Sequence, residues 1–268
     1  MLVLVDVEDR VATVTLNRPE ARNALSSELL AELHEVITGL DARDDVGCTV
    51  LTGADPAFCA GVDLKSLAGE DRGTQQDRLR LPTGRAFMVP PHETPIIGAV
   101  NGPTVTGGLE LAMACDFLIA SDRARFADTH IRVGVMPGAG MTIRLPQLIG
   151  IDRARRMSLT GDFIDAGTAR DWGLVVEVVP HESLLARARQ LAATVAAIPS
   201  DYVREYRRGY DRIGALLGAD AFDTEAEWSR TWMAERFDQS RLSTEREKIV
   251  ARGRAQTSGA DGPDGTPG

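Results

Sequence analysis

Two stretches of this chain share one order of parts: an apolar run, a glycine-containing loop, and a segment with helical spacing. The first is residues 51–67, LTGADPAFCAGVDLKSL, and the second is residues 99–112, AVNGPTVTGGLELA. A strand that leads through a loop into a helix is the repeating unit of α/β proteins. We therefore predict an α/β fold in which each glycine-containing loop joins a strand to a helix.

The rest of the chain extends this prediction to about residue 180. Alternating β-branched runs at 2–7 and 11–16 predict a hairpin. Ser26 and Ser27 precede a helical pattern that reaches Leu40, as expected of a capped helix. Further strands are expected at 47–52, 96–100, 117–120 and 174–179, and further helices near 63–67 and at 109–115, 142–148 and 153–159.

After Pro180 the pattern is helical, at 184–198, 202–217, 221–237 and 244–254. We expect a core over 1–198, a C-terminal helical region over 199–254, and a disordered tail over 255–268, where glycine and proline dominate. The polar stretch 69–80 has no periodicity and is predicted to be a surface segment.

Composition argues against several classes of function. The formal net charge of −9 argues against nucleic acid as the main partner. The three cysteines are scattered, which favours neither a disulfide framework nor a zinc site and fits reduced thiols in a cytoplasmic protein. No apolar run is long enough to span a membrane, so no membrane association is expected.

One acidic residue, Glu110, interrupts the almost entirely apolar or small-residue stretch 98–120. A buried carboxylate is costly unless it is paired or has a chemical task. Gly107 and Gly108 precede it and let a ligand approach N–H groups at the start of a helix. Glu110 is therefore either an acid–base group or an acidic residue that the first turn of a helix favours.

The two glycine-containing loops could act together. The N–H of Val62 in the first loop and that of Gly107 in the second could converge on one oxygen and form an oxyanion hole. The alternative is that both loops are ordinary connections between a strand and a helix. Neither loop matches the glycine patterns of nucleotide-binding loops.

The chain resembles the crotonase, or enoyl-CoA hydratase/isomerase, superfamily. The resemblance rests on five segments in the order typical of that superfamily: NRPEARNALSSEL at 17–29, LTGADPAFCAGVDLKSL at 51–67, PIIGAVNGPTVTGGLELAMACDFLIA at 95–120, ARFADTHIRVGVMPGAGMTIRLPQLIG at 124–150, and LTGDFIDAGTARDWGLVVEVVP at 159–180. It implies a spiral of ββα units followed by C-terminal helices. It also implies a homotrimer or a dimer of trimers that acts on acyl-CoA thioesters without a metal or redox cofactor, coenzyme A entering as part of the substrate.

The resemblance assigns roles to single residues. Val62 and Gly107 fall at the positions whose N–H groups hold a thioester enolate. Ala60, Asp63 and Leu64 fall on the loop that wraps the adenine of coenzyme A. Lys65 could reach a coenzyme A phosphate or the pantetheine arm, or could be a solvated lysine on a helix surface.

The acid–base pair departs from the family pattern. Hydratases of this family place one glutamate at the position of Glu110 and a second at the position that His130 occupies here. A neutral histidine can activate water or relay a proton, so His130 is a substitute active-site group or a hydrogen-bonded structural histidine. Asp128 could also point toward the substrate if the segment is irregular.

Other residues are expected to be structural. His34, His92 and His181 are read as surface or packing residues, and Glu225 and Glu227 as a solvated helix face. Trp228 and Trp232 have helical spacing and favour packing or a subunit interface over an acyl-binding wall. The C-terminal signature usual in the family is missing, so the family's C-terminal acyl and coenzyme A contacts do not carry over.

Three functions follow from this reading. The first is a lyase that adds water reversibly to a 2-enoyl-CoA, with Glu110 as the main acid–base group and His130 as the second. The second is an isomerase that moves a double bond between C3 and C2, for which one carboxylate is enough. The third is a protein that binds acyl-CoA without turnover.

Overall fold

The computed structural model describes residues 1–63, 88–216, 221–237 and 239–257. The predicted helix near 63–67, the polar stretch 69–80 and most of the glycine-rich tail lie outside the described residues. At the centre is a six-stranded sheet in the order β1-β2-β3-β4-β6-β9. Its strands are β1 (Val3–Glu8), β2 (Val11–Leu16), β3 (Cys48–Gly53), β4 (Ile96–Val100), β6 (Phe117–Ser121) and β9 (Glu177–Val179).

The sheet confirms the predicted α/β class. Strands β1 and β2 form the expected antiparallel hairpin, in which Val3 pairs with Leu16 and Glu8 with Val11. All further pairs from β2 to β9 are parallel. A smaller sheet contains β5 (Pro103–Val105), β7 (Arg125–Ala127) and β8 (Ile164–Asp165).

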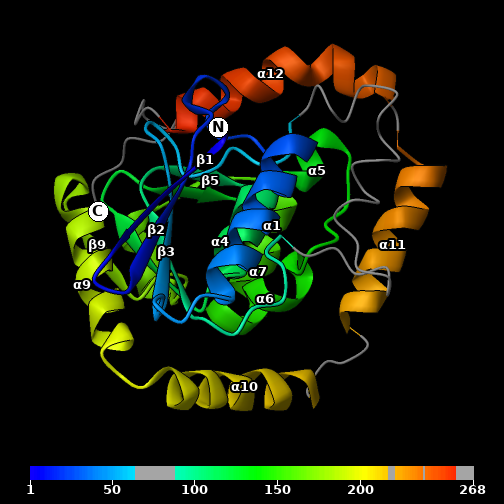
Figure 1. Ribbon diagram of the computed structural model, residues 1–268. Coiled ribbons are helices and arrows are strands. Elements are labelled where there is room, and N and C mark those ends of the chain that lie inside the picture. The colour runs from blue at the N-terminus through cyan, green and yellow to red at the C-terminus, as the bar shows by residue number, and fades with distance from the viewer. Residues whose placement is uncertain (64–87, 217–220, 238, 258–268) are drawn as a thin grey trace.

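Both faces of the central sheet are covered, as parallel strands require. Alternate residues of the strands face opposite layers: Leu51 and Leu118 belong to one apolar cluster, and Val50 and Ile119 to the other. The second cluster is closed by α9 (Leu184–Ala196), which places four residues on the sheet: Leu184, Ala188, Ala192 and Ala196. Figure 1 shows α9 lying beside the sheet, with the N-terminal helix and the central helices on the other side.

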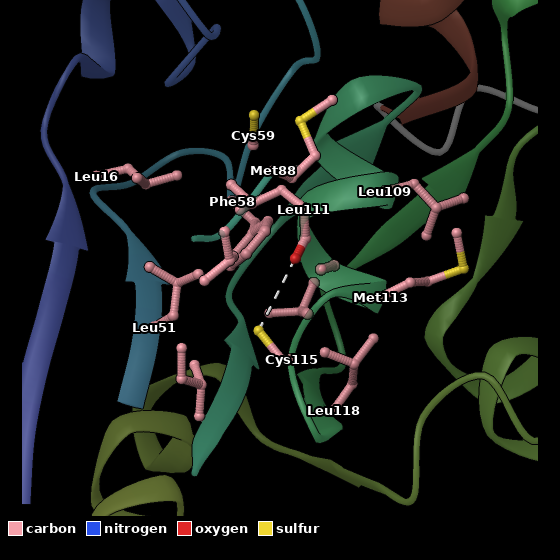
Figure 2. Packing of buried hydrophobic residues seen from close by; sticks show 14 of the residues in the cluster. Leu16, Leu51, Phe58, Cys59, Met88, Leu109, Leu111, Met113, Cys115 and Leu118 are labelled. Carbon is pink, nitrogen blue, oxygen red and sulfur yellow. Dashed lines mark hydrogen bonds between the residues drawn. The ribbon is translucent and has the colours of Figure 1, made fainter. Parts of the chain in front are cut away.

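The other face is covered by α1 (Ser27–Asp41) and α4 (Gly107–Met113), among others. Ser26 caps α1 by accepting the N–H of Leu29 at 3.2 Å, which confirms the predicted helix start. Every residue of α4 is buried. Figure 2 shows two of its leucines, Leu109 and Leu111, in one cluster with Phe58.

One predicted strand is shorter than expected. We predicted a strand over 174–179, but β9 spans only Glu177–Val179. The N–H groups of Leu174 and Val175 donate to the carbonyl of Ala169, at the end of α8 (Ala166–Trp172). The backbone N–H groups of these two residues therefore bond a carbonyl at the end of α8, and the chain joins the sheet only after them.

The predicted helices after Pro180 are present. After α9 come α10 (Ser200–Leu216), α11 (Ala221–Glu235) and α12 (Gln239–Thr257), which follow one another around the periphery of the core (Figure 1). None of the described helices is long and apolar enough to cross a membrane.

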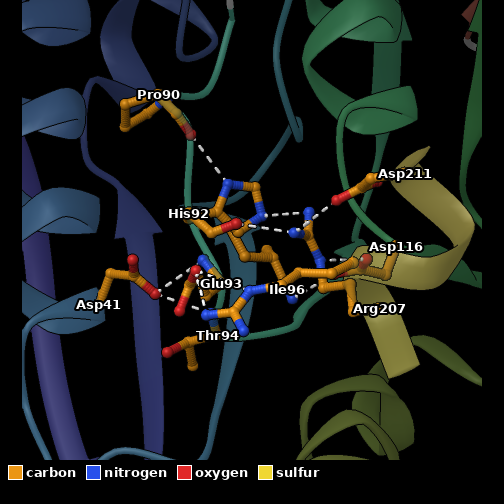
Figure 3. Close-up of polar contacts among 10 residues, drawn as sticks. Asp41, Pro90, His92, Glu93, Thr94, Ile96, Asp116, Arg207 and Asp211 are labelled. Atoms are coloured by element: carbon orange, nitrogen blue, oxygen red, sulfur yellow. Dashed lines mark hydrogen bonds and ion pairs between the residues drawn. The ribbon is translucent and has the colours of Figure 1, made fainter. Parts of the chain in front are cut away.

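Helix α10 is attached to the core by a polar cluster (Figure 3). Arg207 donates to the carboxylate of Asp116 at 2.7 Å and to the carbonyl of His92 at 2.7 Å. The third nitrogen of its guanidinium lies 3.0 Å from Nε2 of His92, whose Nδ1 lies 2.8 Å from the carbonyl of Pro90. Because Nε2 faces a permanent donor and Nδ1 faces an acceptor, His92 is the neutral tautomer with its proton on Nδ1.

Candidate active site

Glu110 lies in the first turn of α4, and its side chain is only 3% exposed. Its Oε1 accepts the N–H of Ala139 at 2.9 Å and that of Met141 at 3.3 Å. Burial raises the pKa of Glu110 to about 7, although the nearby His130 and the Ala139 N–H act in the opposite direction. A carboxyl group with a pKa near neutrality can both take and give a proton.

His130 begins the short helix α5 (His130–Val133) and is 8% exposed. Its Nε2 lies 3.8 Å from Oε2 of Glu110, and its Nδ1 lies 2.7 Å from Oδ1 of Asp128. The structure therefore brings together the two residues that the sequence nominated for acid–base chemistry. Asp128 orients the imidazole so that Nε2 faces Glu110.

The three groups shift one another's pKa values. Burial acts to lower the pKa of His130, but the hydrogen bond and the charge of Asp128 outweigh it, so this pKa is raised. Burial acts to raise the pKa of Asp128, but the hydrogen bonds from His130 and Ser158 outweigh it, so this pKa is lowered. The pair therefore favours an imidazolium beside an ionised Asp128.

Asp128 itself does not serve as the group facing Glu110. Its Oδ1 is occupied by the ring and the N–H of His130, and its Oδ2 accepts the hydroxyl of Ser158 at 2.5 Å. The hydroxyl groups of Thr106, just before α4, and Thr129 form a hydrogen bond of 2.7 Å. These bonds fix the segment that carries His130 to the segment that begins α4.

Two amide groups lie next to this site. The loop before Asp63 pairs with Leu25, which donates to the carbonyl of Gly61 and accepts the N–H of Asp63. In such a parallel bridge the N–H of the central residue, Val62, points away from Leu25. A Cβ placed on Gly107 would lie 3.5 Å from the Val62 nitrogen, so the two amides are neighbours.

Neither the Val62 nor the Gly107 N–H donates to another backbone group among the residues described. Gly107 is the first residue of α4, where N–H groups have no partner within the helix. The Gly107 N–H therefore lies at the start of the helix that carries Glu110, and the Val62 nitrogen lies beside it.

The loop before Asp63 is tied closely to the core. The N–H of Ala60 donates to the carbonyl of Arg22 at 3.0 Å, and Arg18 pairs with Asp63 at 3.1 Å. Leu64 and Lys65, which the family resemblance placed toward coenzyme A, lie outside the described residues. Within those residues, no cluster of three metal-ligating side chains is present.

Sequence reasoning missed one residue at this site. Glu225, predicted to be part of a solvated face, is 4% exposed and accepts the N–H groups of Gly140 and Thr142 at 2.6 and 2.7 Å. Only its neighbour Glu227 is exposed as expected. The prediction for Glu225 was wrong because helical spacing in α11 does not reveal which loop the helix covers.

The two tryptophans of α11 differ in their surroundings. Trp232 donates its indole N–H to the carbonyl of Gly134 at 2.9 Å, whereas Trp228 is exposed. His181 bridges Ser121 and Asp55 at 3.1 and 3.0 Å.

Together these groups can support chemistry on a polarised carbonyl compound. A carboxyl group and an imidazole can move protons, while two neighbouring backbone N–H groups are donors of the kind that can stabilise an oxygen that becomes negative.

Known proteins resemble this chain over most of its length. The sequence model of the enoyl-CoA hydratase/isomerase family matches residues 6–246. A probable enoyl-CoA hydratase of Mycobacterium tuberculosis is 39% identical over 211 residues, which cover 78% of this chain and 81% of the relative.

Solved structures are also similar. An enoyl-CoA hydratase from Mycobacterium smegmatis has a TM-score of 0.79 at 47% identity, covering 87% of this chain and 99% of the other. One from Mycobacterium tuberculosis H37Rv has a TM-score of 0.80 at 45% identity, covering 88% of this chain and all of the other.

Proposed function

Because this chain belongs to the enoyl-CoA hydratase/isomerase family, we propose that it is a lyase that adds water reversibly to a 2-enoyl-CoA thioester. The observation that carries the proposal is the pair formed by Glu110 and His130, whose Oε2 and Nε2 lie 3.8 Å apart. Hydration needs one group that takes a proton from water and one that supplies a proton to C2. The pair provides both.

Each group has a separate task. Glu110, as the carboxylate, takes a proton from water as the water oxygen bonds to C3. The double-bond electrons move toward the thioester, whose oxygen becomes an enolate held by the N–H groups of Val62 and Gly107. His130, protonated through its contact with Asp128, gives the proton that forms the C2–H bond.

A final proton transfer restores the site. After hydration Glu110 is protonated and His130 is neutral, so one proton passes from the carboxyl to the imidazole. The short distance between the two groups and the raised pKa of His130 favour this step. No proton or electron is left over, and water is the only co-reactant.

The binding roles rest on the family pattern together with the position of the loop. We assign Ala60, Asp63, Leu64 and Lys65 to the coenzyme A side of the substrate, next to the Val62 donor. If Lys65 meets a phosphate, Lys65→Ala will raise KM and leave kcat nearly unchanged, because the phosphate contact is the same in the ground and transition states.

The subunits are proposed to assemble as a homotrimer or a dimer of trimers. Helix α10 carries Tyr202, Tyr206 and Tyr210 at four-residue spacing, and these side chains are 67%, 74% and 73% exposed. A row of exposed aromatic side chains is typical of a contact surface. Sedimentation of wild type and Tyr206→Ser would show whether this helix holds the oligomer together.

The test of the reaction is incubation of the protein with a 2-enoyl-CoA in heavy water, followed by product mass. Addition of one deuterated water, lost in Glu110→Gln, supports hydration. Deuterium exchange without addition of water would instead support an isomerase that uses Glu110 alone, and a 3-enoyl-CoA substrate would then be converted. Binding of substrates of several chain lengths without any exchange would contradict both activities and favour a non-catalytic acyl-CoA-binding protein.

A further inference from the structure

Two carboxylates from different parts of the chain divide the N–H groups at the start of α6 (Met141–Ile149) between them. Glu110 accepts those of Ala139 and Met141, while Glu225 accepts those of Gly140 and Thr142. The Thr142 hydroxyl also donates to Glu225. The N–H groups that Glu110 accepts alternate along the chain with those that Glu225 accepts. A shift of the residues bound to one carboxylate therefore also shifts the residues bound to the other.

The start of α6 depends on these two acceptors. Its N-cap residue is Gly140, which has no side chain with which to cap the helix. The first N–H groups of any helix lack partners within it, and a negative charge there is favourable. Glu225 therefore supplies from α11 the cap that the sequence of α6 lacks.

Helix α11 holds the whole loop before α6, and not only its end. Along α11, Ser229 donates to the carbonyl of Met136 at 2.9 Å and Trp232 to that of Gly134 at 2.9 Å. Packing is close as well, because a Cβ on Gly138 would lie 3.2 Å from the Ser229 hydroxyl. Side chains on one face of α11 thus form hydrogen bonds with successive backbone groups along this loop.

We propose that Glu225 is a positioning residue for the acid–base site: by fixing the N–H groups of Gly140 and Thr142, it sets the placement of the neighbouring N–H groups that hold Glu110. The proposal rests on the proposed function, since Glu110 is taken as the acid–base group. It gives α11 an indirect part in the reaction, through the placement of Glu110.

The charge of Glu225 also acts on this site. No lysine or arginine forms an ion pair with Glu225 among the described residues, and the charge of Glu225 acts on His130 and Glu110. The charged groups that act on Glu110 are His130, Glu225 and Asp128. The two carboxylates raise the pKa of Glu110, whereas His130 lowers it.

The test compares Glu225→Gln with Glu227→Gln. Both variants lose one negative charge from α11, but Glu227 is exposed, and no hydrogen bond or ion pair joins it to the site within the part of the chain that the structure describes. Glutamine at 225 keeps the size of the side chain while replacing one acceptor oxygen with a donor, so it cannot hold both N–H groups. We expect kcat to fall about 10- to 100-fold with little change in KM in Glu225→Gln, since misplaced catalytic groups cost this much.

The pH dependence of kcat distinguishes a positioning role of Glu225 from a role that only stabilises the fold. In Glu225→Gln the acidic limb of the kcat profile should move to lower pH, because a negative charge near Glu110 is gone. Glu227→Gln should show the wild-type profile. An active Glu225→Gln enzyme with wild-type kcat and an unmoved acidic limb would overturn the proposal.

Two further measurements keep the test decisive. If Glu225→Gln does not fold, Thr142→Val removes only the hydroxyl donated to Glu225, and it should lower kcat in the same direction while Tm stays near that of wild type. If the wild-type protein hydrates no substrate, the proposed hydration is refuted. Titration of the Glu110 carboxyl group by carbon-13 NMR still tests whether Glu225 positions Glu110. A downward shift of its pKa in Glu225→Gln, absent in Glu227→Gln, supports the inference, and an unchanged titration overturns it.

Discussion

The imidazole Nε2 of His130 lies 3.8 Å from Oε2 of Glu110. This separation is longer than a direct hydrogen bond, so each atom can bond a third atom placed between them. The opposite side of the ring is fixed at 2.7 Å by Asp128. A histidine can therefore stand where the family pattern has a second glutamate, provided that a carboxylate behind it keeps it protonated and oriented.

Glu110→Gln should lower kcat by at least about 100-fold, because the amide cannot take a proton from water. Coenzyme A binding should change little, since the contact removed is with the reacting atoms. Steady-state kinetics and titration with the product thioester measure the two effects separately. An unchanged kcat would refute the role of Glu110.

Asp128→Asn should lower the pKa of His130. The amide oxygen can still accept the Nδ1 proton, but the charge that raises this pKa is lost. The alkaline limb of the activity–pH profile, which reports the loss of the His130 proton, should then move to lower pH. NMR titration of the imidazole measures the shift directly.

Ser158→Ala is the matched control for that experiment. It removes one donor to Asp128 but keeps the carboxylate next to His130. We expect the imidazole titration in this variant to stay closer to wild type than in Asp128→Asn. Equal shifts in the two variants would mean that the charge of Asp128 is not the cause.

The polar cluster around His92 predicts a loss of stability in acid. Burial, chiefly, and the charge of Arg207 lower the pKa of His92 in the folded protein, against the effect of the Pro90 carbonyl, Asp116 and Asp41. Above the unfolded value of about 6.5 the ring is neutral in both states, so it has no pH-dependent effect. As pH falls below that value the unfolded chain binds the proton first, and stability declines until the folded pKa is passed.

His92→Gln removes this titration while the amide can still meet Arg207 and Pro90. Compared with wild type, the variant should lose less unfolding free energy between about pH 7.5 and about pH 5.5. Urea unfolding at the two pH values provides the comparison (the cluster is drawn in Figure 3). Parallel losses in both proteins would exclude His92 as the source.

Two glycine-to-alanine changes should have opposite effects on stability. Gly39 lies in α1 with open space around it, so Gly39→Ala should add about 0.5–1 kcal/mol to the free energy of unfolding. A Cβ on Gly108 would lie 2.3 Å from the carbonyl oxygen of Cys59, so Gly108→Ala must displace backbone. Thermal unfolding should show a higher Tm for the first variant and a much lower Tm for the second.

Much of the fold could be predicted from local pattern. The hairpin, the cap at Ser26 and the helices after Pro180 depend on residues close in sequence, so spacing alone indicated them. The end of the last strand could not be predicted, because the N–H groups of Leu174 and Val175 bond to the preceding helix instead of a strand.

The sequence by itself determined the α/β class and the two glycine-containing loops, and it singled out Glu110, since each of these is read from neighbouring residues. His130 was nominated only through the family resemblance. Only the tertiary structure decided that Asp128 lies behind His130 and that Glu225 is buried against the start of α6. Glu225 is 115 residues from Glu110 in the chain (225 − 110). Helical spacing cannot tell which of two glutamates, Glu225 or Glu227, faces a loop whose position depends on the path of the whole chain.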